Sequence, residues 1–302
     1  MITATRQVKP FLKWAGGKGQ LIEQISSFLP TSFKTGKIKK YFEPFLGGGA
    51  VYFWLADHYD FEQAYLYELN PSVAICYQVI QTNIKKLIKE LSSLEKEYIS
   101  GSEKSREKLF YEKREEFNGF LRRNSANSHL RRAALLMFLN KTCFNGLYRV
   151  NSKGEFNVPF GRYKNPTICN EDNLFAVHDL LRNTEIACGD FEQCLKRADN
   201  TSFVYFDPPY RPISTTASFT SYSKDNFDDS EQKRLRSVFG ELDSLGVNVM
   251  LSNSDPKNVD PEDDFFDDLY DGYNIERLNA TRLINCNAER RGSITEILVM
   301  NY

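Results

Sequence analysis

The segment that sets the fold class reads Phe42-Glu43-Pro44-Phe45-Leu46-Gly47-Gly48-Gly49. Its apolar start, its glycine triplet and the apolar residues 51–56 that follow predict a strand, a tight turn and a helix. Glycines let the backbone approach a ligand closely, and the first turn of a helix presents unpaired N–H groups. Glu68 follows at the end of the next predicted strand, 64–67, where nucleotide-binding α/β folds place an acid that accepts hydrogen bonds from ribose hydroxyls. The segment therefore predicts an α/β fold with a nucleotide-type site.

Two phosphate-binding patterns fail in this chain. The dinucleotide pattern G-x-G-x-x-G is broken because Tyr52 occupies the position of the third glycine. The phosphate-loop pattern around Gly17-Lys18 is broken because Leu12 stands at the distal glycine position and Gly19 replaces the Ser or Thr. A nucleoside ligand without phosphates fits these departures better than a dinucleotide does, and a purely structural turn is the alternative.

Strands and helices alternate toward both ends of the chain. Further strands are predicted at 184–187, 202–206, 247–252, 273–279 and 295–300, with helices at 18–29 and 229–245. Between these ends, residues 73–94, 106–120 and 130–139 read as helices, and 146–150 with 155–158 reads as a β-hairpin around the turn 151–154. Alternating strands and helices predict a Rossmann-like, mostly parallel sheet covered by helices on both faces. The inserted helical region would carry the hairpin.

Composition excludes several classes of protein. With 302 residues, 41% of them apolar, the chain can bury a large core, which excludes disorder. The 39 basic and 40 acidic residues give a net charge of −1, so no global field attracts a polyanion. The apolar window 44–56 is too short to span a bilayer, and the N-terminus lacks the apolar core of a secretion signal. Six scattered cysteines without a Cys-x-x-Cys pattern predict neither a disulfide framework nor a metal site, so we expect a reduced cytoplasmic protein.

Charge is distributed unevenly along the chain. Residues 122–164 hold nine basic residues and one acid, Glu155, a net charge of +8, interleaved with aromatic and amide side chains. That mixture suits the reading of phosphates and base edges. Residues 255–271 hold eight acids and one lysine, a net charge of −7, which we interpret as a solvated helix face.

A second motif, Asp207-Pro208-Pro209-Tyr210, follows the apolar strand 202–206. In open α/β sheets, ligands bind beyond the carboxyl ends of the strands. The two prolines fix φ and leave the carbonyls of Asp207 and Pro208 without ladder partners. A carboxylate, a free carbonyl and an aromatic ring suit a planar amine held by its N–H groups and its face. The alternative is a strand that is merely terminated by prolines.

Five motifs in order carry a resemblance to a known family. They are Phe11-Leu12-Lys13-Trp14-Ala15-Gly16-Gly17-Lys18, the segment 42–49, Asn145-Gly146-Leu147-Tyr148-Arg149-Val150-Asn151, Phe156-Asn157-Val158-Pro159-Phe160-Gly161-Arg162-Tyr163 and Asp207-Pro208-Pro209-Tyr210. Together they resemble the Dam-type DNA adenine-N6 methyltransferases, which use S-adenosylmethionine and act on GATC. The resemblance implies a catalytic domain of residues 1–71 and 170–302 and a DNA target-recognition domain of residues 72–169.

The resemblance also implies roles for residues of the catalytic domain. Asp207 and the Pro208 carbonyl would accept the two N6–H bonds of adenine, and Tyr210 would stack on the base after it leaves the duplex. The cofactor would be held by Trp14, Lys18, Phe45, Gly47, Gly48, Gly49, Glu68, Asp190, Phe191 and Asp207. Relatives often carry Asp where this chain has Glu68, whose side chain is one methylene longer. For Trp14 the alternative is a core position, and for Lys18 it is a helix surface.

For the recognition domain, the resemblance implies base reading by the hairpin. Arg149 would make bidentate contacts to a guanine, or contact a phosphate instead. Leu147 and Pro159 would pack against thymine or adjacent base edges, or simply within the hairpin. Phe144 and Asn145 would fill the gap left by the flipped adenine, and Lys13 would touch the outer guanine. Asn157 and Arg162 complete the predicted DNA-binding set.

Other functions compete with this interpretation. An RNA or protein N-methyltransferase could share the fold and the Pro-Pro-Tyr sequence, and a non-catalytic DNA-binding regulator could retain a degenerate site. An NAD-dependent oxidoreductase would need the third glycine. We expect double-stranded DNA as the partner, a monomer, and a cytoplasmic location with the nucleoid.

Overall fold

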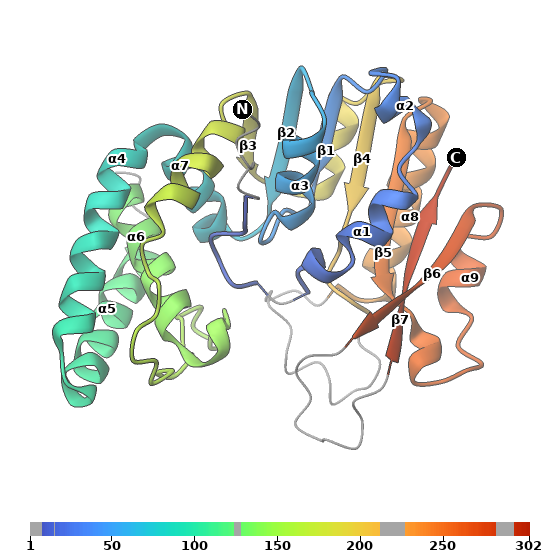
Figure 1. Ribbon diagram of the computed structural model, residues 1–302. Coiled ribbons are helices and arrows are strands. Elements are labelled where there is room, and N and C mark those ends of the chain that lie inside the picture. Colours follow the sequence, from blue (N-terminus) through green and yellow to red (C-terminus); the bar gives the residue numbers. More distant parts are fainter. Residues whose placement is uncertain (1–7, 15, 124–127, 212–226, 282–292) are drawn as a thin grey trace. The chain divides into compact units, whose positions relative to one another are not determined.

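The computed structural model describes residues 8–14, 16–123, 128–211, 227–281 and 293–302. Within these residues the strands form a seven-stranded sheet in the order β3-β2-β1-β4-β5-β7-β6 (Figure 1). Strand β1 pairs in parallel with β2 and β4, and β4 with β5, whereas β7 runs antiparallel to both β5 and β6. The strands are β1 Lys40–Glu43, β2 Gln63–Glu68, β3 Thr184–Cys188, β4 Ser202–Phe206, β5 Asn248–Ser254, β6 Asn274–Thr281 and β7 Ser293–Met300. The predicted Rossmann-like α/β class is confirmed.

The helices follow the predicted pattern with local differences. They are α1 Ile22–Ser27, α2 Thr31–Lys34, α3 Ala50–His58, α4 Pro71–Ser100, α5 Glu103–Arg123, α6 His129–Thr142, α7 Glu171–Leu180, α8 Asp229–Ser244 and α9 Phe265–Leu269. The helix predicted over 18–29 is divided into a 3₁₀ turn, Lys18–Gln20, and α1. Helices α2, α7 and α9 were not predicted. No helix in the described ranges has the length and apolar character needed to cross a bilayer.

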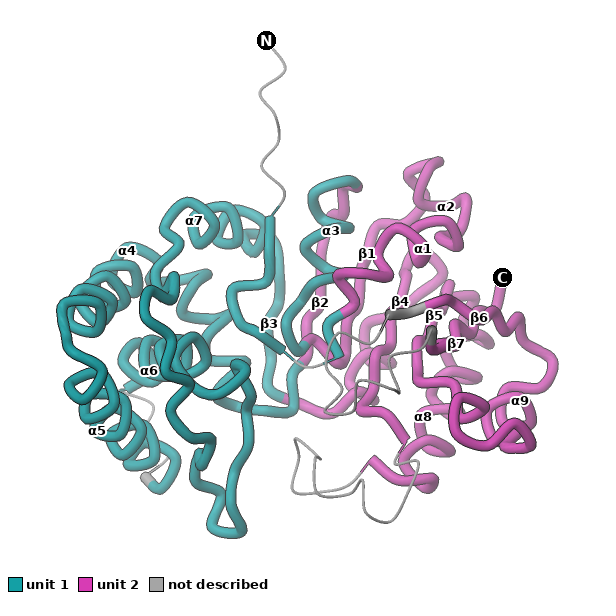
Figure 2. Tube along the Cα trace, turned by 60° about the horizontal axis from the view of Figure 1, so that its bottom comes forward, with its two compact units in different colours: residues 1–17, 47–58, 68–188 teal, residues 18–46, 59–67, 189–302 magenta. Residues whose placement is uncertain are grey.

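The chain divides into two compact units (Figure 2). Unit 1 comprises residues 1–17, 47–58 and 68–188, and unit 2 comprises residues 18–46, 59–67 and 189–302. These bounds differ from the predicted domains because the glycine turn and Glu68 group with the helical region. Contacts inside unit 1 explain this grouping, since Trp14 lies against the turn and the Tyr77 hydroxyl of α4 donates to the Gly47 carbonyl. The functional division at residues 72–169 remains a prediction.

Unit 2 is built on fully buried parallel strands. All five residues of β4 are buried, as expected for a parallel strand covered on both faces. Helix α8 packs against β5 through Leu235, Val238, Phe239 and Leu242, which recur at the spacing of one helix face. Asp228 caps α8 by accepting from the N–H groups of Ser230 and Glu231. The apolar face of α8 and the buried strands beside it thus fix the position of the carboxyl end of β4.

Unit 1 is a helical body centred on the pair α4 and α6. Asn70 caps α4 by accepting from the Ser72 N–H at 3.0 Å, and Pro71 takes the first helical position. Helix α6 packs along α4 and α5, so ten of its fourteen residues are buried and its apolar residues do not form a single stripe. Packing on several sides explains why residues 130–139 read as a compact apolar helix.

The predicted hairpin forms its turn but not two full strands. Asn151 N donates to Glu155 O and Asn157 N donates to Arg149 O, on either side of a single bridge between Val150 and Phe156. The remaining backbone groups of Phe156 bond to the side-chain amide of Asn118 on α5, at 2.8 and 3.1 Å. A helix side chain therefore takes the place of ladder partners, and the expectation of strands over 146–150 and 155–158 was too regular.

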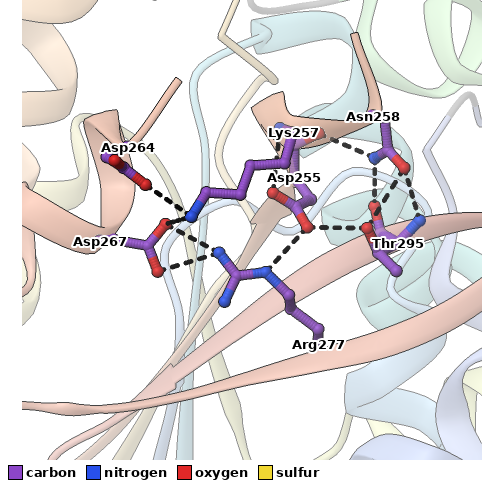
Figure 3. Close-up of polar contacts among 7 residues, drawn as sticks. All are labelled: Asp255, Lys257, Asn258, Asp264, Asp267, Arg277 and Thr295. Carbon is purple, nitrogen blue, oxygen red and sulfur yellow. Dashed lines mark hydrogen bonds and ion pairs between the residues drawn. The ribbon is translucent and has the colours of Figure 1, made fainter. Parts of the chain in front are cut away.

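The acidic segment 255–271 is not a solvated helix face, so that interpretation was wrong. Lys257 pairs with Asp264 and Asp267, and Arg277 of β6 pairs with Asp267 and with the buried Asp255 (Figure 3). Within the segment, only the 3₁₀ turn Pro256–Asn258 and the five residues of α9 are helical. Arg211 also pairs with Asp263, so four of the eight acids have a cation partner, which composition could not reveal. The other four are exposed: Asp260, Glu262, Asp268 and Asp271.

Candidate functional site

The glycine turn of unit 1 has no room for side chains at two positions. Gly47 and Gly49 have φ of +47° and +69°, a region that favours glycine. A Cβ on Gly47 would lie 2.8 Å from the Trp14 ring, and one on Gly49 would lie 2.6 Å from the Tyr77 hydroxyl. A Cβ on Gly48 would lie 3.2 Å from Trp14 Cβ. Trp14 is half-buried against this turn, and its assignment to cofactor binding remains a prediction.

Glu68 is bonded to the same turn. Its Oε2 accepts from Gly47 N at 2.9 Å and its Oε1 accepts from Asn70 N at 2.8 Å. Burial raises the pKa of Glu68, while the two N–H groups act in the opposite direction. A carboxylate offers about four acceptor positions, so each oxygen retains capacity for a ligand hydroxyl. Glu68 therefore orders the turn and can still accept hydrogen bonds from a ribose.

In unit 2, Phe45, Phe191 and Asp190 form an aromatic and acidic cluster. The Phe45 and Phe191 ring centroids are 5.3 Å apart, and Phe45 is half-buried whereas Phe191 is buried. Asp190 caps the 3₁₀ turn that begins at Phe191 and accepts from Arg234 at 2.8 and 2.9 Å. Hydrogen bonds from Arg234 lower the pKa of Asp190. This carboxylate is engaged within the protein, and the partly exposed face of Phe45 is the part of the cluster open to a ligand.

The motif after β4 lies in a buried cluster of charges in unit 2. Asp207 Oδ1 accepts from Lys18 Nζ at 2.6 Å and from Ser252 Oγ at 3.2 Å. No group among the described residues donates to Oδ2. Burial raises the pKa of Asp207, although the Lys18 ammonium opposes this shift. One oxygen is thus fixed by the protein, and the other is available to a substrate.

Lys18 is 2% exposed, so it is not the helix-surface residue of the alternative interpretation. Burial disfavours its charge, but the neighbouring carboxylates and tyrosines hold the pKa of Lys18 well above its usual value. Its ammonium also donates to the Tyr210 hydroxyl at 2.8 Å. Lys18 was assigned to cofactor binding, and here it holds two residues of the Asp207-Pro208-Pro209-Tyr210 motif.

The prolines of the motif present different carbonyls. The Pro209 carbonyl accepts from Gln232 Nε2 at 3.4 Å, and Gln232 on α8 is itself buried. No described group donates to the carbonyl of the buried Pro208. The backbone of the motif thus offers an acceptor in addition to Asp207 Oδ2, and an amino group requires two acceptors for its N–H bonds.

The predicted DNA-binding residues lie in unit 1, most of them at its surface. Lys13, Phe144, Asn145, Arg149, Pro159 and Arg162 are exposed, and Leu147 and Asn157 are half-buried. Asn145 and Arg162 have positive φ, 54° and 57°, which is uncommon for residues other than glycine. Arg149 Nε donates to Asn157 Oδ1 at 2.8 Å, so the two predicted base readers are joined across the hairpin. A second, longer bond runs from Arg149 Nη2 to the Asn157 carbonyl at 3.5 Å. The two bonds orient the guanidinium, and no described group accepts from its Nη1.

Part of the positive charge of residues 122–164 is neutralised within unit 1. Arg122 pairs with Glu115 and Glu155, and Arg131 pairs with Glu90 and Glu116. Arg132 is buried and donates to Ser72. The other basic residues of the stretch 128–164 have no carboxylate partner in the described ranges: Lys141, Arg149, Lys153, Arg162 and Lys164. The expected DNA-facing charge is therefore smaller and more localised than the sequence count indicates.

Comparison with known proteins matches these motifs to one family. Residues 14–284 match the family described as D12 class N6 adenine-specific DNA methyltransferase. The chain belongs to this family. It is 50% identical over 297 residues to the type II methyltransferase M.MjaIII of Methanocaldococcus jannaschii, covering 98% of this chain and 100% of that protein. It is 40% identical to M1.LlaDCHI of Lactococcus lactis subsp. cremoris and 31% identical to a DNA adenine methylase of Vibrio cholerae, each covering 98% of this chain and 96% of the relative.

As a member of the D12 class, the protein is an adenine-specific DNA methyltransferase, an enzyme that acts on DNA. This excludes the oxidoreductase, the RNA or protein methyltransferase and the non-catalytic regulator considered from the sequence. The recognised family and the enzyme class are thus confirmed, whereas the individual roles of the site residues remain predictions.

Sequence reasoning missed one acid of this methyltransferase's charged cluster. Glu296 Oε2 of β7 lies 3.4 Å from Lys18 Nζ, and this buried oxygen has no hydrogen-bond partner among the residues that the structure describes. Glu296 raises the pKa of both Lys18 and Asp207 through its charge. The available signal was an acid directly before the apolar run 297–300 of the strand Ser293–Met300. Its partner could not be identified from the sequence, because Glu296 and Lys18 lie at opposite ends of the chain.

Proposed function

We propose that this enzyme transfers a methyl group from S-adenosylmethionine to N6 of adenine within GATC in double-stranded DNA, by base flipping. The observation that carries the proposal is the divided carboxylate of Asp207, with Oδ1 bound by Lys18 and Ser252 and Oδ2 without a described donor. An amine whose lone pair is delocalised into a ring needs acceptors for its N–H bonds before it can act as a nucleophile.

The residues of the motif would activate the adenine amine together. Asp207 Oδ2 would accept one N6–H and the Pro208 carbonyl the other, which favours a tetrahedral nitrogen as the new bond forms. Tyr210 would stack on the base once it leaves the duplex. Lys18 holds both Asp207 and Tyr210, so the acceptor and the stacking ring would keep a fixed relation during the reaction.

The residues predicted to bind the cofactor fit a nucleoside. Glu68 keeps acceptor capacity for ribose hydroxyls, and the partly exposed ring of Phe45 beside Phe191 offers an apolar surface to a purine. When bound, S-adenosylmethionine would supply an electrophilic methyl group on a positively charged sulfur. The glycine turn, with Trp14 against it, would let the backbone approach the ligand closely.

Recognition of GATC would fall to the hairpin of unit 1. The exposed guanidinium of Arg149, oriented by Asn157, would read guanine O6 and N7 by two hydrogen bonds. Leu147 and Pro159 would contact neighbouring bases, and the exposed Phe144 with Asn145 would occupy the space of the flipped adenine. We propose that the enzyme works as a monomer on DNA of the nucleoid, in the cytoplasm.

The test is a methylation assay with purified protein, S-adenosylmethionine and plasmid DNA. We expect the product to resist a nuclease that cuts GATC only when its adenine is unmethylated. Asp207→Ala should abolish methylation and change the Kd for S-adenosylmethionine by less than about tenfold, since its role is on the target amine. Asp60→Ala, which removes an exposed acid of the same unit, is the matched control. Methyl transfer to N6 at other sequences, with GATC still cut, would refute the specificity but not the chemistry.

A further inference from the structure

A cavity in unit 1 collects three lysines, and the family resemblance gives a role to only one of them, Lys13. It has a volume of about 360 Å³ and is lined by residues 13, 141 and 163–167. Lys141 is half-buried near the end of α6, Lys164 is exposed, and the ammonium of Lys13 lies 4.7 Å above the Tyr163 ring. None of the residues that line the cavity carries a carboxylate.

This arrangement differs from the other cations of the same unit. Arg122 and Arg131 each pair with two glutamates, so their positive charges are compensated within the protein. Lys13, Lys141 and Lys164 have no carboxylate within 4 Å in the described ranges. Positive charges brought together without anions repel each other, so the folded protein alone gains nothing from this placement. A bound anion would remove the repulsion.

We propose that the Lys13, Lys141 and Lys164 cavity binds a phosphodiester of the DNA backbone, with the half-buried Lys141 as its central cation. The proposal rests on the proposed action on DNA and adds a residue, Lys141, and an anchor point to it. A phosphodiester carries one negative charge and accepts hydrogen bonds from ammonium groups, and such contacts fix the register of a protein on the duplex without reading sequence. The Tyr163 hydroxyl and the Asn165 amide, which also line the cavity, offer further donors.

The charge state of Lys141 gives this proposal a measurable signature. Burial first, and then the charge of Lys13, lowers the pKa of Lys141 from 10.5 to about 8. The other ionisable groups that line the cavity are Lys13, Tyr163 and Lys164, and no carboxylate lies among them. A phosphodiester would return the pKa toward its usual value. Binding of DNA would therefore take up a proton above pH 8.

The expected size follows from these two values. If DNA restores a pKa near 10.5, proton uptake is about 0.1 per protein at pH 7 and about 0.9 at pH 9. The same linkage weakens DNA binding by about tenfold between pH 7 and pH 9. Both quantities come from calorimetric titration of the full-length protein with a GATC duplex, repeated in buffers of different ionisation enthalpy.

Three variants separate Lys141 from a general loss of charge. Lys141→Gln should weaken binding at pH 7 and abolish the uptake at pH 9. Lys141→Arg should bind as the wild type does at pH 7, but without uptake, because arginine stays charged throughout this range. Lys153→Gln removes an exposed lysine of the same basic stretch and should leave the uptake intact.

Each outcome has a distinct meaning. Wild-type protein that does not bind DNA at all would refute the proposed function, whereas DNA binding without uptake at pH 9 would overturn this inference alone. Uptake that persists in Lys141→Gln would also overturn it. Titration with inorganic phosphate instead of DNA covers the other source of the same anion. Uptake with phosphate and none with DNA would assign the cavity to a free anion.

Discussion

Replacing Lys18 with methionine would leave the carboxylates of Asp207 and Glu296 buried without their cation. The Lys18 Nζ lies 2.6 Å from Asp207 Oδ1 and 3.4 Å from Glu296 Oε2. At an effective dielectric constant of about 20, Coulomb's law gives an attraction of about 6 kcal/mol for the first pair and about 5 kcal/mol for the second. Desolvation of the three groups offsets much of this, and removing one partner of a buried pair typically lowers stability by about 3–5 kcal/mol. We expect that loss in the unfolding free energy of Lys18→Met at pH 8.

The loss should depend on pH in a defined direction. Burial already raises the pKa of Asp207 while Lys18 opposes it, so removing the ammonium raises that pKa further. An acid whose pKa is higher in the folded protein than in the unfolded chain loses its contribution to stability as the pH rises through the folded-state value. The deficit of Lys18→Met should therefore be full at pH 8 and should shrink as the pH falls toward about 4.

Urea unfolding of wild type and variant at several pH values measures this deficit. Adding Asp207→Asn to Lys18→Met should restore part of the stability, since one uncompensated carboxylate is removed. Lys40→Met is the matched control, because its ion pair with Asp199 in the same unit is 31% and 45% exposed and should contribute about 1 kcal/mol or less. A deficit below about 1 kcal/mol, or one equal at all pH values, would refute the reasoning.

Three further predictions concern single residues. Glu68→Ala should weaken binding of S-adenosylmethionine by about 1–3 kcal/mol in calorimetry, with DNA affinity in the absence of cofactor unchanged. An unaltered cofactor Kd would show that Glu68 only stabilises the glycine turn. Glu296→Gln should lower kcat about tenfold with little change in KM. It should also move the acidic limb of the pH profile to lower pH, because the charge of Glu296 raises the pKa of Asp207. Glu276→Gln on β6 is the control and should have neither effect. Arg149→Ala should lose about 1–3 kcal/mol of discrimination at one outer base pair in initial rates on GATC and its single-base variants, and a uniform fall would reduce it to a phosphate contact.

The sheet could be predicted because its strands carry their own signals. Residues 203–206 are apolar without interruption, and β4, which begins one residue earlier at Ser202, is wholly buried. Helices α2 and α9, with four and five residues, are too short for a periodic pattern. Helix α7 was overlooked although Asn170 caps it, because only Leu174 and Val177 of its residues are buried.

Some residues of the candidate site could be predicted from the sequence, whereas the contacts of others depend on the fold. Asp207 and Glu68 could be predicted because each stands at the carboxyl end of a strand, a position visible in the sequence. The engagement of Lys18 by Asp207, and the presence of Glu296 beside it, depend on which strands become neighbours in the sheet. The pairing of Arg131 with Glu90 and Glu116 depends in the same way on helix packing. Composition counts such charges, but only the fold decides which of them stay available to a ligand.

The bonds around Asp255 have a consequence for genetics. Thr295 precedes Glu296 on β7, and its N–H, carbonyl and hydroxyl are bonded to Asn258 and Asp255 (Figure 3). Damage to this anchorage would loosen the strand that carries Glu296 while leaving every proposed DNA and cofactor contact in the chain. A screen for heat-sensitive alleles should accordingly recover changes at Asp255 or Asn258. Strains that methylate their DNA at low temperature and stop on warming would then carry changes in the acidic segment 255–271. From its composition alone, that segment would be considered dispensable.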